Sequence, residues 1–236
     1  MKKYYFCGVG LGPGDPGLVT LKALEVLKSV DVIFVPSSKN SANCIAKSII
    51  DSLPGVKAEV IQLSFAMTSD MAERERFYSN NVDEIKNALF LGKSCAFALI
   101  GDPLTYGTYG YIIKALANIS EIEIETIPGV NSWSSLAAKN NFILVENKEE
   151  LRIVPSFEFE ADQIALDNGT QETIVYLKAF KEKNNILDSL DSNSEVIYGA
   201  NIGLENEFIS SDREAIREAK PTYLSMIIER KNVKKT

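Results

Sequence analysis

The sequence contains, directly after a short apolar run, the glycine-rich stretch Gly8-Val9-Gly10-Leu11-Gly12-Pro13-Gly14-Asp15-Pro16. Four glycines at every second position let the backbone approach a neighbour closely, because no Cβ atom intervenes. An apolar run that ends in such a loop is typical of the first strand of an α/β domain. The stretch predicts either a ligand-binding loop at a strand end or a turn shaped only for packing.

The same loop satisfies the G-x-G-x-x-G spacing of a dinucleotide site over residues 12–17, but its chemistry argues against that interpretation. Pro13 and Pro16 remove backbone donors. Asp15 would repel a pyrophosphate. The following helix is expected to begin near Thr20, so its N-terminus would not lie on the last glycine as phosphate binding requires. We therefore expect no dinucleotide here, and a turn shaped only for packing remains the alternative to a binding loop.

Strand and helix patterns alternate through the first half of the chain. Strands are expected at 4–9, 32–35, 58–63, 95–100 and 122–127, with Pro36 ending the second, and helices at 20–28, 42–53, 72–91 and 109–118. This order predicts a parallel sheet with right-handed crossovers. The fully apolar segment 95–100 predicts a central strand that is covered on both faces.

The second half is less regular. Strands are expected at 152–155, 173–177, 195–198, 207–210 and 223–228, and helices at 131–140, 181–190 and 212–219. Gly203 lies between two strand patterns and predicts a tight connection, hence a mixed sheet. The chain is therefore expected to form two α/β domains, 1–127 and 128–236, which meet near Pro128-Gly129.

Composition excludes several classes of function. The 236 residues carry 32 acidic and 25 basic side chains, a net charge of -7, which argues against a general nucleic-acid binder. Histidine is absent, so His acid–base catalysis, Ser-His-Asp triads and His-ligated metals are excluded. Cys7, Cys44 and Cys95 are far apart, and no metal site is expected. No apolar run approaches the ~20 residues of a membrane span, and we expect a cytoplasmic protein.

Two further loops follow predicted strands. Residues Gly101 to Thr108, with the sequence Gly-Asp-Pro-Leu-Thr-Tyr-Gly-Thr, come after the most apolar strand, at the carboxyl edge where ligands of open α/β sheets bind. Residues Thr126 to Ser135 join a strand to a helix of small residues. Taken singly, the first could be an ordinary turn, and the second a hinge between domains with a buried Trp133.

Taken jointly, the three loops resemble the tetrapyrrole (corrin/porphyrin) methylase family over essentially the whole chain. The opening glycine stretch looks like the family's first motif, and Gly101-Asp102-Pro103 and Pro128-Gly129-Val130 look like its other signatures. The resemblance implies two α/β domains with S-adenosylmethionine (SAM) in the cleft between them, S-adenosylhomocysteine as the product, and a homodimer.

The resemblance also implies site residues. The cofactor pocket is expected to be lined by Pro13, Ile100, Gly101, Asp102, Thr105, Asn131, Ser132 and Leu177. Asp102 would either pair with the cofactor's ammonium group or accept bonds from the amides of its own loop.

Within the family, the chain is most similar to the subgroup that methylates C-20 of precorrin-2 or cobalt-factor II in cobalamin synthesis. The similar segments are Tyr106-Gly107-Thr108, Phe65-Ala66-Met67-Thr68, Arg152-Ile153-Val154-Pro155 and Tyr198 to Gly203; Ala66 and Gly107 depart from the subgroup, which usually has proline and serine there. The similarity implies substrate contacts at Tyr106, Met67 and Arg152. Tyr106 is also the one motif candidate for a catalytic base.

Other assignments remain open at this point. They are methylation at C-11 or C-17, uroporphyrinogen-III methylation, diphthine synthase, and a non-catalytic module that binds SAM or a tetrapyrrole. An acidic protein that binds a polycarboxylate ring needs a local basic patch. The basic residues available near the expected cleft are Arg74, Arg76, Arg152, Lys178, Lys181 and Lys183. The alternative for each is a solvated surface charge.

Overall fold

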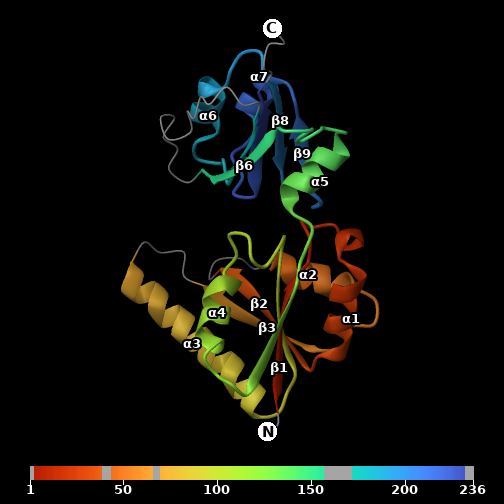
Figure 1. Cartoon of the computed structure of the whole chain (residues 1–236), viewed down its shortest axis with the longest axis vertical. Coiled ribbons are helices and arrows are strands. Elements are labelled where there is room, and N and C mark those ends of the chain that lie inside the picture. Colours follow the sequence, from red (N-terminus) through yellow and green to blue (C-terminus); the bar gives the residue numbers. More distant parts are fainter. Residues whose placement is uncertain (1–2, 39–43, 66–69, 157–171, 232–236) are drawn as a thin grey trace. The chain divides into compact units, whose positions relative to one another are not determined.

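The computed structural model describes residues 3–38, 44–65, 70–156 and 172–231. The chain divides into two compact units, Met1–Asn131 and Ser132–Thr236. From the sequence, the boundary between the two domains is expected after residue 127, a few residues earlier. Each unit has its own sheet and its own cores, and each is described by itself (Figure 1).

The first unit is built on a parallel sheet of the order β3-β2-β4-β1-β5. Its strands are β1 (Tyr4–Gly10), β2 (Val32–Ser38), β3 (Glu59–Phe65), β4 (Cys95–Leu99) and β5 (Ile122–Ile127). The apolar strand β4 is central and buried along its length, whereas β5, with its alternating Ile and Glu, lies at the edge. The predicted parallel sheet and the place of β4 in it are confirmed.

Helices cover both faces of this sheet (Figure 1). They are α1 (Leu21–Ser29) and α2 (Ile45–Ser52) on one face, and α3 (Met71–Phe90) and α4 (Tyr109–Leu116) on the other. α1 begins where expected because Oγ1 of Thr20 accepts the amide of Ala23 at 3.2 Å. Asp70 caps α3 in the same way. Two apolar cores result, one on each face.

One sequence expectation about this sheet is wrong. Pro36 does not end the second strand, because β2 continues to Ser38. β2 pairs with β4 only as far as Phe34, and beyond that point it pairs with β3 alone. A proline is tolerated where a strand has a neighbour on one side only, since its missing donor then leaves no ladder bond unmade.

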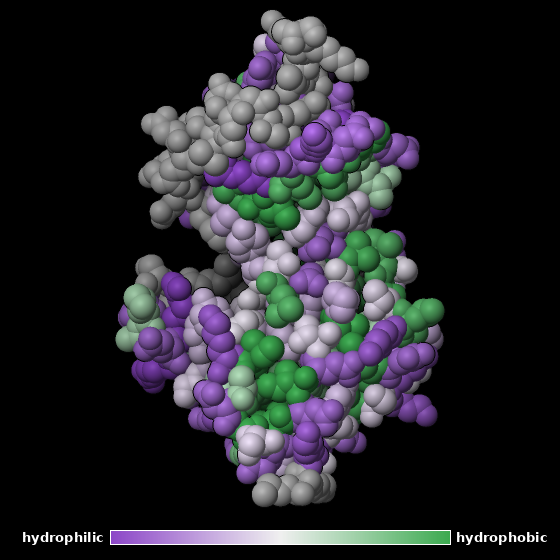
Figure 2. Space-filling model, viewed as in Figure 1, coloured by the Kyte–Doolittle hydropathy of each residue, from purple (hydrophilic) through white to green (hydrophobic). Residues whose placement is uncertain are grey.

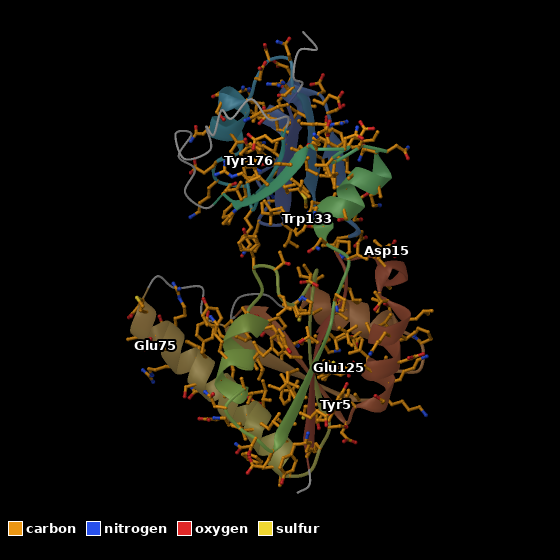
Figure 3. All side chains as sticks on the ribbon, viewed as in Figure 1. Tyr5, Asp15, Glu75, Glu125, Trp133 and Tyr176 are labelled. Atoms are coloured by element: carbon orange, nitrogen blue, oxygen red, sulfur yellow. The ribbon has the colours of Figure 1, made fainter. Side chains whose placement is uncertain are left out.

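At the edge of the sheet formed by β5, polar side chains join β5 to β1 (Figure 3). The hydroxyl of Tyr5 donates to Oε2 of Glu125 at 2.7 Å, and Lys22 of α1 pairs with Oε1 at 2.7 Å. These two donors hold the pKa of Glu125 below its ordinary value. No further strand lies beside β5 in this sheet, and these contacts hold β5 to β1 and α1.

The second unit has a mixed sheet of the order β6-β7-β10-β8-β9, as expected. Its strands are β6 (Glu150–Pro155), β7 (Glu172–Leu177), β8 (Glu195–Ala200), β9 (Phe208–Ser210) and β10 (Ser225–Arg230). β6 and β7 are parallel, and the other pairs are antiparallel. α5 (Ser132–Lys139) covers one face, and α6 (Lys183–Ser189) and α7 (Arg213–Glu218) cover the other.

The surface carries both kinds of side chain. Figure 2 shows green apolar areas interrupted by purple hydrophilic side chains on the visible face of the first unit. Large exposed apolar residues of this unit include Leu21, Leu91, Leu104 and Tyr111. Among the described residues, no helix is both long enough and apolar enough to cross a membrane.

Candidate functional site

The three loops that the sequence singled out meet at the carboxyl edge of the first sheet. We call Gly10, Gly12, Gly101 and Gly129 the glycine edge. Gly12 and Gly101 form a two-bond bridge, with N–H···O distances of 3.3 Å and 2.6 Å. A Cβ atom on Gly10 would lie 2.5 Å from the amide nitrogen of Gly129, and one on Gly129 would collide with the carbonyl oxygen of Gly101. Backbone therefore lies directly on backbone here.

These contacts bear on the rejected dinucleotide site. The amides of Leu11, Gly12 and Gly101 donate to backbone carbonyls and are not turned toward a phosphate. The loop continues into a short 3-10 turn, η1 (Pro16–Leu18), in which Asp15 accepts the amide of Gly17 at 2.8 Å (Figure 3). α1 starts at Leu21, well past the last glycine. The geometry agrees with the argument against phosphate binding.

Asp102 ties two of the loops together. Its Oδ1 accepts the amide of Leu104 at 3.0 Å and the hydroxyl of Thr105 at 3.1 Å. Its Oδ2 accepts the amide of Gly129 at 3.2 Å. The second of the two roles that the sequence left open, a carboxylate bonded to nearby amides, is thus present. Pairing with a cofactor's ammonium group stays a prediction.

The loop after Asp102 presents an unusual tyrosine. Tyr106 has a left-handed backbone, with φ of 50°, and its side chain is half exposed. Residues other than glycine rarely adopt this backbone conformation, and those that do are enriched at functional sites. Gly107 follows, and a Cβ atom there would lie 2.8 Å from Leu99 and 2.9 Å from the carbonyl of Pro103. The departure from serine at 107 therefore goes with close packing of this loop.

The remaining expected cofactor residues lie in both units. Pro13 and Ile100 belong to the loops of the glycine edge, and Asn131 ends the first unit. Ser132 is the first residue of α5 in the second unit, one residue before the buried Trp133 (Figure 3).

Leu177 and Arg152 belong to the second sheet but point to opposite faces. Leu177 ends β7 and packs with Trp133 of α5. Ile153 packs on this same face, so Arg152, its neighbour in β6, points toward the face of α6 and α7. The expected substrate residue Met67 lies outside the described residues.

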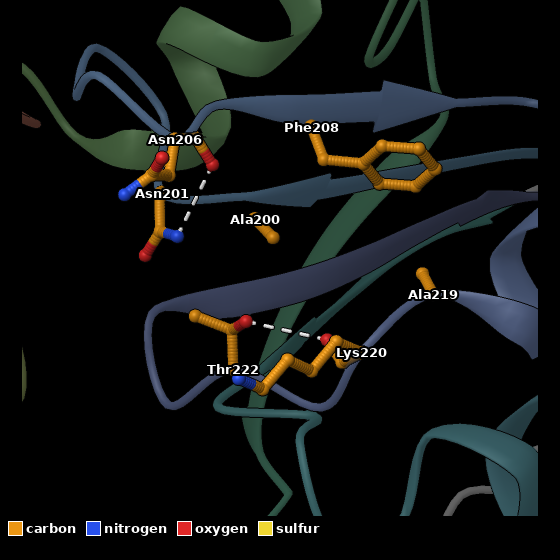
Figure 4. A pocket seen from close by; sticks show the side chains of 7 residues that line it. All are labelled: Ala200, Asn201, Asn206, Phe208, Ala219, Lys220 and Thr222. Atoms are coloured by element: carbon orange, nitrogen blue, oxygen red, sulfur yellow. Dashed lines mark hydrogen bonds between the residues drawn. The ribbon is translucent and has the colours of Figure 1, made fainter.

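Sequence reasoning missed a pocket in the second unit (Figure 4). It has a volume of about 630 Å³ and is lined by Ala200, Asn201, Asn206, Phe208, Ala219, Lys220 and Thr222. Nδ2 of Asn201 donates to the carbonyl of Asn206 at 3.2 Å. The hydroxyl of Thr222 donates to the backbone carbonyl of Lys220, also at 3.2 Å. The segment Tyr198 to Gly203, which resembles a family subgroup, contains two of these lining residues, Ala200 and Asn201.

One of the basic candidates has a different role from either expectation. Lys183 is 3% exposed, and its ammonium donates to the carbonyls of Arg217, at 3.1 Å, and Ala219. Burial, together with the nearby Arg217, lowers the pKa of Lys183. It caps the carboxyl end of α7, where a cation is favourable. It is therefore neither a surface charge nor exposed to a substrate.

The described cysteines are free and buried. Burial raises the pKa of Cys7 to about 11 and that of Cys95 to about 12, so both are thiols at neutral pH. Within the described ranges, no group of three Cys, Asp or Glu side chains is placed to hold a metal ion.

Comparison with known proteins gives a consistent family. The family model of the tetrapyrrole (corrin/porphyrin) methylases matches residues 6–215. A protein of Methanocaldococcus jannaschii, named probable cobalt-precorrin-2 C(20)-methyltransferase, is 36% identical over 200 residues, which are 84% of this chain and 81% of that protein. The cobalt-precorrin-2 C(20)-methyltransferase of Salmonella typhimurium is 27% identical over 72% of this chain and 70% of its own length.

The fold has solved counterparts. The uroporphyrin-III C-methyltransferase of Thermus thermophilus, crystallised with S-adenosylhomocysteine, superposes with a TM-score of 0.66 at 17% identity, over 96% of this chain and 97% of that one. At this identity the likeness concerns the fold. The family match over most of the chain, the relative at 36% identity and the three joined loops lead to one conclusion: the chain belongs to the tetrapyrrole (corrin/porphyrin) methylase family.

Proposed function

We propose that this protein is a SAM-dependent C-methyltransferase of cobalamin (corrin ring) biosynthesis. It would methylate C-20 of precorrin-2 or cobalt-factor II, giving precorrin-3A or cobalt-factor III and S-adenosylhomocysteine. The observation that carries the proposal is the 36% identity with the Methanocaldococcus jannaschii protein named probable cobalt-precorrin-2 C(20)-methyltransferase, over most of both chains. Relatives named for uroporphyrinogen-III or C-11 methylation are more distant. The alternatives are those two reactions, C-17 methylation, and a non-catalytic module that binds SAM or a tetrapyrrole.

The glycine edge supports SAM as the methyl donor. A SAM molecule has no phosphate, so it needs no cluster of free amides or basic side chains. A Cβ atom on Gly101 would meet nothing within 4 Å, and φ of this residue is 73°, so bare backbone borders open space there. Pro13, Ile100, Gly101, Asp102, Thr105, Asn131, Ser132 and Leu177 are the residues that we propose to hold the donor. When bound, SAM supplies an electrophilic methyl group on a sulfonium.

The residues of this chain have a limited chemical task in such a reaction. Transfer of the methyl group moves the positive charge of the sulfonium onto the ring and creates no oxyanion, so the absence of histidine is compatible with it. The main contributions are to align the meso carbon with the methyl group and to exclude water. A proton must also leave C-20. Tyr106, which is half exposed, has a left-handed backbone and follows Asp102 by four residues, is our candidate for the group that faces this proton.

The proposal includes a cytoplasmic homodimer, which is what the family resemblance implies. Sedimentation equilibrium of the purified protein tests the dimer; a single species with the 26.0 kDa mass of one chain would contradict it.

The reaction is tested by incubating the protein with methyl-labelled SAM and one of four rings: precorrin-2, cobalt-factor II, cobalt-precorrin-4 or uroporphyrinogen III. Label should enter precorrin-2 or cobalt-factor II. Label in another ring would replace the proposed substrate by that ring. Binding of SAM with no transfer to any ring would favour a non-catalytic module.

A further inference from the structure

Lys178 has a backbone conformation that its side chain does not favour. Among the described residues, five that are not glycine have a positive φ, and three of them are asparagines, which adopt this region readily. The other two are Tyr106 and Lys178, the latter with φ of 58°. Strain of this kind persists where the surrounding structure fixes it, and it is concentrated at functional sites.

The surroundings hold Lys178 in place. It follows Leu177 at the end of β7, and the amide of the next residue, Ala179, donates to the carbonyl of Ser225 at 3.2 Å. The ammonium of Lys178 lies 5.8 Å from the ring centroid of Tyr223, within the range of a cation–π contact. Tyr223 is 40% exposed. The half-buried lysine and the ring thus form a cation–aromatic pair that reaches solvent.

This pair lies at a single edge of the second sheet. β7 and β8 end at this edge, and the antiparallel β10 begins there. The amide of Asn201, just after β8, donates to the carbonyl of Leu224, which follows Tyr223. Thr222, next to Tyr223, lines the pocket described above. The edge therefore combines a pocket, an aromatic ring and a lysine.

Burial lowers the pKa of Lys178, which means that its cation is poorly solvated where it lies. An arriving carboxylate would compensate for that lost solvation through a charge-assisted hydrogen bond. The neighbouring ring offers a flat apolar surface to a conjugated macrocycle.

We propose that Lys178, positioned over Tyr223, binds a carboxylate side chain of the macrocyclic substrate and makes the enzyme selective for polycarboxylated rings. This inference rests on the proposed function. Lys178 would be a specificity-determining residue that contributes to ring binding and not to binding of the methyl donor.

The test compares Lys178→Met with Lys148→Met. Both replace one lysine of the second unit, but Lys148 is exposed and precedes β6, at the other edge of the sheet. Binding of uroporphyrin, a fluorescent polycarboxylate ring, is measured by fluorescence titration at low and high salt, with mesoporphyrin, a ring of few carboxylates, for comparison. Binding of S-adenosylhomocysteine is measured by calorimetry and also reports correct folding. Lys178→Arg tests rescue by a conserved charge.

We expect Lys178→Met to weaken uroporphyrin binding at least about tenfold, to change mesoporphyrin binding much less, and to reduce the salt dependence. Binding of S-adenosylhomocysteine should stay within twofold, Lys148→Met should resemble the wild type, and Lys178→Arg should recover part of the loss. Equal ring binding by Lys178→Met and Lys148→Met would overturn the proposal.

The proposed function can fail separately. Lys178-dependent binding of the ring by a protein that transfers no methyl group would preserve the role of Lys178 and remove the reaction. Failure of the wild type to bind any polycarboxylate ring would overturn both.

Discussion

The interiors of the two units differ in kind. Among the described residues of the first unit, the buried polar side chain is Asn81, which donates to the carbonyl of Ser64 at 2.9 Å. In the second unit the buried polar or charged residues are Ser135, Ser156, Glu172, Thr173, Lys183, Ser194, Ser225 and Glu229. A parallel sheet covered by helices on both faces needs apolar strands, whereas the mixed sheet here relies on buried polar contacts as well.

Glu229 illustrates the second kind of interior. It is 2% exposed, and its carboxylate accepts the hydroxyl of Ser194 at 2.8 Å and that of Tyr176 at 3.1 Å. Burial, together with this carboxylate, raises the pKa of Tyr176. A buried network of this type is costly when one partner is removed. Substitution of buried polar residues should therefore destabilise mainly the second unit, because most of the described buried polar residues lie there.

The two sheet edges differ in the same way. The glycine edge of the first unit is made of backbone on backbone. The edge of the second unit that carries Lys178 presents side chains with charge and aromatic surface. We propose that the backbone and small polar groups of the first edge serve the methyl donor, and that Lys178 and Tyr223 of the second edge serve the charged ring.

Gly129→Ala should have the largest effect, because it breaks the backbone contact of the first edge. Its Cβ atom would collide with the carbonyl oxygen of Gly101, and neither backbone can move without opening the loop junction. We expect a loss of about 3 kcal/mol in the free energy of unfolding, measured by urea denaturation. The control is Gly110→Ala in α4, where nothing lies within 4 Å; a gain of up to about 1 kcal/mol is expected there. Equal effects of the two substitutions would remove the special status of the glycine edge.

Lys183→Met removes buried polar contacts that are typical of the second unit. The carbonyls of Arg217 and Ala219 lose their donor, while the apolar part of the side chain is kept. We expect a destabilisation of about 2 kcal/mol, and Lys183→Arg should not restore it fully because the site is closed. If Lys183→Met were as stable as the wild type, the burial of the cation would cancel the value of its bonds, and the lysine would not be a structural requirement.

Asp102→Ala sharpens the role of the first edge. The substitution removes the acceptor for Gly129, Leu104 and Thr105, so the two loops lose their link. We expect SAM affinity to fall by at least the ~1.4 kcal/mol that makes a factor of ten, measured by calorimetry. Asp102→Asn, which keeps one acceptor oxygen, should lose less. Unchanged affinity in a folded Asp102→Ala protein would place Asp102 outside the donor site.

The smallest effect concerns the thiols of the first unit and appears at alkaline pH. The pKa of Cys95 is raised from 9.0 to about 12 by burial, so the unfolded chain loses this proton first. The stabilisation is complete below pH 9 and is lost as pH rises from there toward 12. Between pH 8 and pH 10 the wild type should lose about 1 kcal/mol more stability than Cys95→Val. Identical pH profiles would mean that the thiol ionises equally in both states.

Local patterns predicted most of the elements and the meeting of the loops. The apolar segment at 95–100, the cap at Thr20 and the glycine stretch each specify a local structure, and parallel strands bring their carboxyl ends to one edge. The mixed second sheet followed from strands separated by a short connection at Gly203.

What the sequence could not predict depends on partners far along the chain. Pro36 lies within a strand because β4 pairs with β2 only up to Phe34. Lys183 is buried because the carboxyl end of α7, thirty residues or more further along the chain, accepts hydrogen bonds from its ammonium. The pocket is lined by residues that lie before and at the start of β9 and by residues that follow α7. None of these residues has a neighbour in sequence that signals its surroundings.

The most direct test of the account is to locate the transferred carbon. The protein is incubated with SAM carrying a ¹³C-methyl group and with precorrin-2 under anaerobic conditions, and the product is examined by NMR. The account predicts one new methyl signal, on the meso carbon C-20, with release of S-adenosylhomocysteine in equal amount. A methyl signal at any other ring carbon, or no incorporation by a protein that binds both ligands, would contradict it.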